Sequence, residues 1–321
     1  MSASHYIGID IGGTKTNIGL IDEAGQIVEC EKVITQMSGE DSFHAIKRII
    51  ETTKSMVDHL DSEIKVESVG IGIPGTVERK EGTVLFAPNL GWKDVPIKKL
   101  FSAVFSQPIY VGQDTEAAAL GEFLFGAGKG LNNMICITIG TGVGCGLVLD
   151  GKLYKGRFFT AGEFGHTLVE KDGLPCNCGK KGCLEAYASG TAILKRFKMK
   201  VDEGSYSSLL EKLNVDDIRT EDIFVEAKQG DSLAIAIIND AINYLSMGIT
   251  NAVNLLGPEA IILSGGIGSE QELFIEPLIK KSNSAIYSLL VDKVKIANAD
   301  LGEYAPLVGA AMLFKDPLYN T

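Results

Sequence analysis

Residues 10–22 read DIGGTKTNIGLID, and residues 138–150 read TIGTGVGCGLVLD. Each stretch follows a short apolar segment that predicts a strand, and each ends in an Asp and a Gly that favour a hairpin turn. Chance similarity of two hairpins is the alternative, but the matched Gly, Thr and final Asp positions favour duplication. The recurrence therefore predicts an α/β chain built from two related halves.

Both repeats carry a glycine-rich turn after the strand, where backbone N–H groups can hold phosphate oxygens. One such turn is weak evidence, because most glycine-rich hairpins bind nothing. Two of them, one in each half, predict a nucleotide held between the halves. A third turn follows the apolar strand at 260–263 and suits the nucleoside. The candidate nucleotide-binding residues are Asp10, Gly12, Gly13, Thr14, Lys15, Thr138, Gly140, Thr141, Gly142, Gly144, Gly265 and Gly266. Asp10, at a strand end, could also hold Mg²⁺ directly or through water.

A second informative stretch, residues 163–190, reads EFGHTLVEKDGLPCNCGKKGCLEAYASG. It contains His166, Cys176, Cys178 and Cys183, and three thiolates with one imidazole form a common tetrahedral set for structural zinc. A disulfide would need an oxidising compartment, and inert buried thiols do not suit so polar a segment. The stretch therefore predicts a zinc site.

Two carboxylates, Glu163 and Glu185, bracket the predicted zinc site. A closed metal site would hold both acids in fixed positions. The segment therefore predicts a substrate pocket whose loop is held in place by the metal. His166 could face the substrate as well as the metal.

Two further polar residues have both a chemical and a structural interpretation. Asp114 follows the strand expected at 109–112, where it could be a general base or a helix N-cap. Asn89 lies in the segment 86–92, where it could bind a polyol or merely satisfy its own turn. The residues alone leave both alternatives open.

Composition bounds the class of protein. The chain has 321 residues and a net charge of −11, and its basic residues form no long run, which argues against a nucleic-acid surface. No apolar run approaches the length of a membrane span, and the first residues lack the pattern of a signal peptide. Six cysteines without an export signal suit a reducing cytoplasm.

Apolar spacing predicts helices at 41–59, 117–125, 233–256 and 307–314. In the long helix at 233–256 the expected buried stripe is Ile235, Ile238, Ile242, Leu245, Ile249 and Val253. Residues 190–230 predict short helices and polar loops without recognisable chemistry.

Taken in order, the motifs resemble those of the ROK family of bacterial sugar kinases, most closely its glucokinase members, over almost the whole chain. The matching segments are DIGGTK at 10–15, GIGIPG at 70–75, APNLGW at 87–92, IGTGVGCG at 139–146, EFGH at 163–166, CNCGKKGCLE at 176–185 and SGGI at 264–267.

The resemblance implies a two-domain actin/hexokinase-like (ribonuclease H-like) fold with internal duplication. The small domain would comprise residues 1–115 and about 300–321, and the large domain residues 116–299. The implied activity is ATP-dependent phosphorylation of a hexose, most similar to conversion of glucose to glucose 6-phosphate, with Mg²⁺ and Zn²⁺ as cofactors. Relatives of this kind are often dimers or tetramers.

By the same resemblance, Asp114 corresponds to the catalytic base. The residues that would contact the sugar are Asn89, Gln113, Asp114, Glu163, His166 and Glu185, with His166 also on zinc.

Some positions depart from the family pattern. The family usually has Asn immediately before the catalytic Asp, whereas this chain has Gln113, so kinases for N-acylmannosamine, allose or fructose stay open. Glu116 stands where relatives often carry a short polar residue. The repressor branch places a DNA-binding helix-turn-helix before the first phosphate motif, and nine residues precede Asp10 here. A sugar-binding sensor without catalysis is the alternative from another class.

Overall fold

The computed structural model describes residues 4–37 and 39–316. The chain divides into two compact units, the first comprising residues 1–132, 146–161 and 303–321 and the second residues 133–145 and 162–302. The small domain predicted from sequence includes residues 1–3, 38 and 317–321, which lie outside the described residues.

The sheet of the first unit has the strand order β3-β2-β1-β4-β8. Strands β1, β2 and β3 form antiparallel pairs, while β4 lies parallel to both β1 and β8. The bounds are β1 Ser4–Ile11, β2 Lys15–Asp22, β3 Ile27–Ile34, β4 Lys65–Ile73 and β8 Ile109–Gln113. A smaller antiparallel sheet contains β5 Thr76–Glu78, β6 Thr83–Ala87 and β7 Trp92–Val95.

The second five-stranded sheet has the order β11-β10-β9-β12-β13. Its strands are β9 Met134–Ile139, β10 Val143–Leu149, β11 Lys152–Tyr154, β12 Ala260–Ser264 and β13 Lys295–Asn298. Numbered along the chain, both sheets have the order 3-2-1-4-5, which confirms the predicted duplication.

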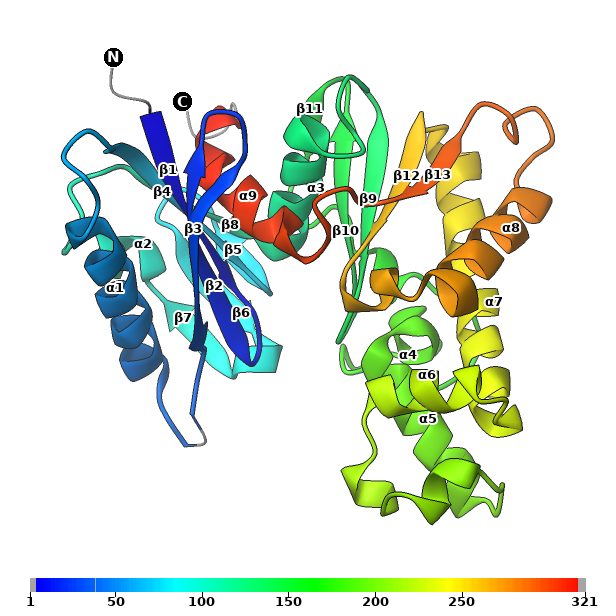
Figure 1. Cartoon of the computed structure of the whole chain (residues 1–321). Coiled ribbons are helices and arrows are strands. Elements are labelled where there is room, and N and C mark those ends of the chain that lie inside the picture. Colours follow the sequence, from blue (N-terminus) through cyan, green and yellow to red (C-terminus); the bar gives the residue numbers. More distant parts are fainter. Residues whose placement is uncertain (1–3, 38, 317–321) are drawn as a thin grey trace. The chain divides into compact units, whose positions relative to one another are not determined.

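The helices of the first unit are α1 Ser42–Asp58, α2 Ile97–Ser102, α3 Asp114–Phe125 and α9 Ala305–Ala311. Helix α1 lies on one face of the first sheet and α9 on the other (Figure 1). The predicted helix at 41–59 is confirmed, with Asp41 as the cap, whose Oδ1 accepts a hydrogen bond from His44 N at 2.9 Å.

Close backbone packing fixes the position of α3. A Cβ on Gly70 of β4 would lie 1.8 Å from Ala310 O, and one on Gly309 would lie 1.7 Å from Ala117 O. These contacts require glycine, because any side chain would push α9 away from the sheet or from α3. Helix α3, which the sequence placed at the start of the large domain, is thus held on α9 within the first unit.

The helices of the second unit are α4 Glu185–Ala188, α5 Gly190–Asp202, α6 Thr220–Lys228, α7 Ser232–Leu256 and α8 Glu276–Ala285. Short 3₁₀ or π turns occur in both units at Pro88–Leu90, Phe164–His166, Ser208–Glu211, Val215–Asp217, Gly266–Ser269, Gln271–Ile275, Gly302–Tyr304 and Leu313–Lys315.

Helix α7 carries the predicted buried stripe with one exception. Ile235 is 36% exposed, so its place in the stripe was wrong, whereas the other five residues are buried. Ala234, in the same first turn, is fully buried, so the buried stripe runs through Ala234 and Ile235 lies at its edge. Within the described residues, α7 is the one helix long and apolar enough to cross a membrane by length and composition; half of its most apolar stretch is buried, and core helices also meet that criterion.

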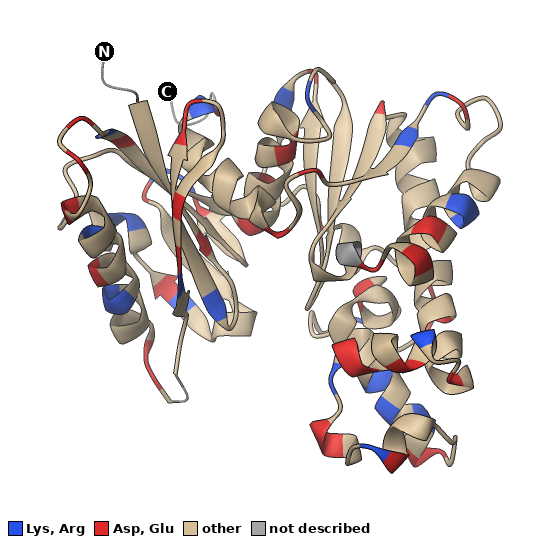
Figure 2. Ribbon diagram, in the orientation of Figure 1, with Lys and Arg blue, Asp and Glu red and all other residues tan. Residues whose placement is uncertain are grey.

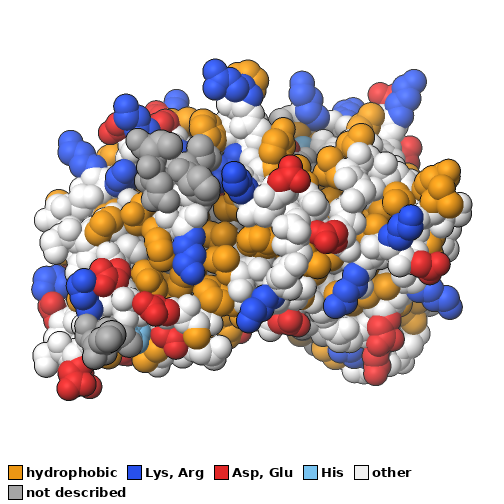
Figure 3. All heavy atoms as spheres, turned by 90° about the horizontal axis from the view of Figure 1, so that it is seen from above, with side chains coloured by type: hydrophobic (Ala, Val, Ile, Leu, Met, Phe, Trp, Pro, Cys, Tyr) orange, Lys and Arg blue, Asp and Glu red, His pale blue; other side chains and the backbone are white. Residues whose placement is uncertain are grey.

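Charged residues are dispersed along both units. Lys and Arg are interspersed with Asp and Glu over both units (Figure 2), although the charged residues of some elements, such as α3, are all acidic. On the face shown in Figure 3, described side chains of both signs lie between apolar ones.

Candidate active site and metal centre

Asp114 is the first residue of α3, and Gln113 is the helix cap. The alternative that Asp114 is the N-cap was therefore wrong. The reason is local: Gln113 keeps the extended conformation of β8, with φ −74° and ψ 146°, so the chain turns into the helix one residue later than a cap at 114 requires. The carboxylate of Asp114 accepts a hydrogen bond from Thr115 N at 2.8 Å.

Asp10 and Asp114 share the carboxyl edge of the first sheet. Strands β1, β4 and β8 run parallel, Asp10 is paired with Gly72, and the next residue of β4, Ile73, is paired with Gln113. The sheet register therefore brings these two predicted acids together at the edge where α/β sheets place ligands.

Burial perturbs both acids. It raises the pKa of Asp10 to about 7, with a further contribution from the charge of Asp114, although the amide of Asn17 opposes the shift. Burial likewise raises the pKa of Asp114 to about 6; the hydrogen bond from Thr115 N opposes this shift, and the charge of Glu116 adds to it. Two neighbouring carboxyl groups with raised pKa values are typical of a functional site.

Gln113 and Asn89 have different surroundings. The Gln113 side chain is buried, and its Nε2 donates to the carbonyl of Gly75 at 2.9 Å, so it ties the end of β8 to the turn after β4. Asn89 is exposed in the 3₁₀ turn before β7. Trp92 anchors that turn: it is 2% exposed, and its Nε1 donates to Gln36 Oε1 at 2.8 Å.

The first glycine-rich turn connects β1 and β2. Gly12 N donates to Lys15 O at 3.0 Å, and Thr35 Oγ1 donates to Gly12 O at 2.8 Å. These bonds fix the base of the turn, while Gly13, Thr14 and Lys15 are exposed at its tip. An exposed tip on a fixed base is suited to receive phosphate oxygens.

The second glycine-rich turn, residues 140–142, connects β9 and β10 and is bonded to a predicted sugar ligand. Gly140 N donates to Gly142 O at 3.0 Å, and Val143 N donates to Glu185 Oε2 at 2.9 Å. A Cβ on Gly142 would lie 2.5 Å from the same carboxylate oxygen. Glu185, at the start of α4, is therefore packed directly on the turn.

The third glycine-rich turn lies at the same edge as the second. Strand β12 runs parallel to β9 with Ser264 paired to Thr138, so their carboxyl ends coincide. Gly265 has φ 96°, and a Cβ there would lie 2.5 Å from Ile139 O. The two predicted nucleotide turns of the second unit are thus neighbours.

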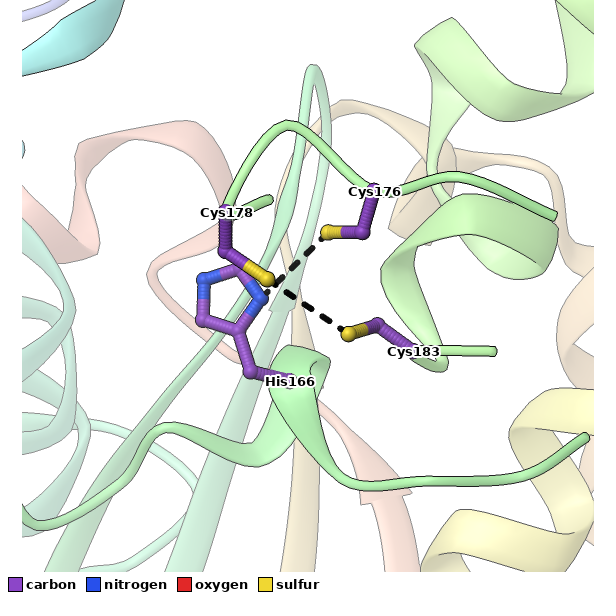
Figure 4. Close-up of side chains that lie close together, drawn as sticks. All are labelled: His166, Cys176, Cys178 and Cys183. Atoms are coloured by element: carbon purple, nitrogen blue, oxygen red, sulfur yellow. Dashed lines mark hydrogen bonds between the residues drawn. The ribbon is translucent and has the colours of Figure 1, made fainter. Parts of the chain in front are cut away.

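The four predicted metal ligands converge. Their ligand atoms all lie within 4.8 Å of one another. Cys178 Sγ lies 3.6 Å from Cys183 Sγ, and Cys176 Sγ lies 3.6 Å from His166 Nδ1 (Figure 4). A tetrahedral zinc ion with Zn–S bonds of about 2.3 Å separates its ligand atoms by roughly 3.5–3.8 Å. The two separations of 3.6 Å fall in that range, so the residue types and these two distances fit a zinc ion.

Backbone turns hold the cysteines in place. Cys176 N donates to Lys180 O at 2.8 Å, and Gly182 N donates to Leu174 O at 2.9 Å. Gly182 has φ 78°, and a Cβ there would lie 1.8 Å from Glu170 O, so only glycine fits this turn.

Electrostatics favour a cation at this cluster. Burial and the neighbouring thiols Cys178 and Cys176 raise the pKa of Cys183 to about 12, and burial also raises the pKa of Cys176. All six cysteines are free thiols. Without a metal, Cys176 and Cys183 therefore keep their protons at neutral pH. A divalent cation would favour their deprotonation and offset the repulsion among the resulting thiolates.

His166 presents its two ring nitrogens to different partners. Nδ1 faces Cys176, whereas Nε2 lies 3.8 Å from Glu163 Oε2, and both His166 and Glu163 are exposed. One histidine can therefore serve the metal and orient a carboxylate.

The sequence model of the ROK family matches residues 6–317. The chain belongs to the ROK family.

Related ROK proteins include enzymes and regulators. A glucokinase from Streptomyces coelicolor is 37% identical over 316 residues, covering 97% of this chain and 98% of the relative. The crystal structure of a ROK family glucokinase from Streptomyces griseus, in complex with glucose and AMPPNP, is 37% identical with a TM-score of 0.82, covering 96% and 98% of the two chains. A xylose repressor from Caldicellulosiruptor bescii is 32% identical, covering 97% of this chain and 78% of the repressor. The predicted actin/hexokinase-like fold of the ROK sugar kinases is thereby confirmed.

Sequence reasoning missed two partners of the acids. Asn17 donates to Asp10 at 3.3 Å; its alternation with buried residues along β2 could have indicated that it shares a face with Asp10. Arg79 forms a buried ion pair with Glu116, and nothing in the charged segment ERKE at 78–81 distinguishes it from an ordinary solvated turn.

Proposed function

We propose that this protein is an ATP-dependent glucokinase, which transfers the γ-phosphoryl group of ATP to the 6-hydroxyl of glucose. The observation that carries the proposal is the position of Asp114, partly buried at the start of α3 and beside Asp10 at one sheet edge. The full-length similarity to glucokinases, one of them solved with glucose and AMPPNP, supports the choice of substrates.

Phosphoryl transfer requires alignment, charge neutralisation and an acceptor for one proton. Asp114 is the proposed acceptor: with a pKa of about 6 it is ionised at pH 7 yet more basic than an ordinary carboxylate. The proton of the 6-hydroxyl passes to Asp114 as the hydroxyl oxygen bonds to the γ-phosphorus and the bond to the ADP oxygen breaks.

The other predicted residues bind and orient the two substrates. Backbone amides in the turns at residues 12–14 and 141–144 hold phosphates, apart from those of Gly12 and Val143, which donate within the protein. The turn at 265–266 receives the nucleoside. Mg²⁺, when bound, neutralises phosphate charge, and Asp10 would hold it directly or through water. Asn89, Gln113, Glu163, His166 and Glu185 bind sugar hydroxyls, and a hexose that leaves these polar groups unpaired is disfavoured.

We further propose zinc as the resident metal of His166, Cys176, Cys178 and Cys183. Its role is structural: it fixes the segment between Glu163 and Glu185, so both carboxylates keep their positions. Reduced thiols in this site suit a cytoplasmic enzyme of carbohydrate metabolism. We propose a homodimer or homotetramer, which light scattering on the purified protein would test.

A coupled ADP-release assay with ATP, Mg²⁺ and a panel of hexoses tests the proposed reaction. We expect turnover with glucose, and we expect Asp114→Asn to lose about 10²- to 10⁴-fold in kcat while glucose still binds by calorimetry. Full turnover by Asp114→Asn would remove Asp114 as the base. Turnover only with N-acetylmannosamine, allose or fructose would change the substrate and keep the chemistry. No turnover with any sugar would favour a sugar-binding sensor, a role to which the similarity with the xylose repressor gives some support.

Metal analysis tests the zinc proposal separately. We expect about one zinc per chain, lost in Cys178→Ser together with several degrees of Tm, because one of four ligands is removed. Cys30→Ser, which changes an exposed cysteine far from the cluster in sequence, is the matched control. Unchanged zinc content and Tm in Cys178→Ser would contradict the assignment.

A further inference from the structure

A buried ion pair lies beside the start of α3. Arg79 follows β5 and is 8% exposed, while Glu116 is the third residue of α3 and is 3% exposed. The Arg79 guanidinium donates to Glu116 Oε2. A charge pair this deep is costly to desolvate, and removal of one partner leaves the other charge uncompensated.

The pair reaches the proposed base through the helix start. Glu116 Oε2 also accepts a hydrogen bond from Gln113 N at 3.4 Å, and Gln113 immediately precedes Asp114. The carboxylate of Glu116 therefore joins Arg79 to the backbone that sets the direction of Asp114.

The neighbouring strand is shaped around the guanidinium. Gly112, in β8, has no side chain, and a Cβ there would lie 2.9 Å from Arg79 Nη1. Any side chain at position 112 would therefore crowd the guanidinium that pairs with Glu116.

The charges of the pair also act on the proposed base. Glu116 is a like charge two residues from Asp114 and contributes, after burial, to the raised pKa of Asp114. Arg79 balances the charge of Glu116. Loss of Arg79 alone would leave a buried carboxylate facing the proposed base without a counter-charge.

We propose that Arg79 and Glu116 are a positioning pair, which holds Asp114 in its reactive orientation and charge environment. This inference rests on the proposed function. Neither residue touches substrate; both act through the first turn of α3. The pair therefore matters for kcat more than for binding of either substrate.

Four variants test the pair: Arg79→Met, Glu116→Gln, the double variant Arg79→Met/Glu116→Gln, and Arg79→Lys. We expect Arg79→Met to lose about tenfold or more in kcat, with both KM values within about threefold of the parent. The double variant, which leaves no uncompensated charge, should recover to within about threefold of the parent kcat. Arg79→Lys keeps the positive charge but loses the planar guanidinium group, so it should retain a higher kcat than Arg79→Met.

A second buried ion pair of the same unit supplies the control. Lys155, after β11, pairs with Asp316, near the end of the described chain, and neither belongs to α3. Lys155→Met should lower Tm as Arg79→Met does, while its kcat, measured well below Tm, stays near the parent value. If Lys155→Met lost as much kcat as Arg79→Met, the effect would be general destabilisation, and the positioning role would be overturned.

Parent-like kcat in Arg79→Met, or no recovery in the double variant, would overturn the proposal as well. Failure of the proposed function can be told apart from failure of this proposal. It would appear as absent turnover in the parent protein, or as full turnover in Asp114→Asn, with Arg79 unchanged.

Discussion

Asp114 is made more basic by its removal from water and less basic by the hydrogen bond from Thr115 N, and burial is the larger effect. A general base works only when it is deprotonated. Because the pKa of Asp114 is about 6, we expect kcat/KM for glucose to rise about tenfold per pH unit below pH 6 and to level off above pH 7. The measurement is kcat/KM from pH 5 to 8 at saturating Mg²⁺ and ATP.

The control for this pH profile is Asp114→Asn, whose residual rate should lack the ionisation near pH 6. A parent profile that is flat between pH 5 and 7 would contradict the base assignment. Asp10 has its own raised pKa, but bound Mg²⁺ favours its ionised form, so saturating Mg²⁺ isolates the titration of Asp114.

At the scale of elements, the segment 174–183 depends on two glycines with positive φ. Gly179 has φ 84° and open space around its Cβ position, whereas a Cβ on Gly182 would lie 1.8 Å from Glu170 O. Gly179→Ala should cost about 1–2 kcal/mol of stability, the strain of the left-handed conformation alone. Gly182→Ala adds the clash and should lower both Tm and zinc retention further.

These two alanine variants form a matched pair, because backbone strain is common to both and only the clash differs. Thermal unfolding and zinc content after dialysis against a chelator give the comparison. Equal losses of Tm and zinc in the two variants would show that the clash with Glu170 O costs nothing. The segment would then shift to make room for the added methyl group.

A structural element can be predicted from the sequence when the residues in contact lie close together along the chain. The cysteine cluster was predicted because its ligands and turns occupy one short segment, and the four ligand atoms do converge. Arg79 and Glu116 are 37 residues apart, and only the fold brings them together. The cap of α3 was ambiguous for a similar reason: whether β8 ends at residue 112 or 113 is decided by its pairing with Ile73 of β4.

At the scale of the whole molecule, the duplication was readable because each repeat begins with a local hairpin around a glycine-rich turn. Once the two hairpins are placed, strands β4 and β8 complete one sheet, and strands β12 and β13 complete the other in the same order. The small sheet of β5, β6 and β7 follows no repeated sequence pattern, and only a turn was expected within residues 86–92, where β6 ends and β7 begins.

Net charge gives a prediction that no single residue can. The chain carries −11, and its proposed substrate MgATP carries about −2, so they repel at long range, while the amides of the glycine-rich turns attract phosphate only nearby. Because the Debye length falls to about 10 Å at 0.1 M salt, added KCl should weaken the repulsion and leave the short-range attraction. We expect kcat/KM for ATP to rise severalfold between about 0.01 and 0.1 M KCl at fixed free Mg²⁺. Glucose is neutral, so its kcat/KM measured at saturating ATP is the internal control and should stay constant. A fall in kcat/KM for ATP would instead show that a local positive field, with Lys15 at the first turn, outweighs the charge of the molecule.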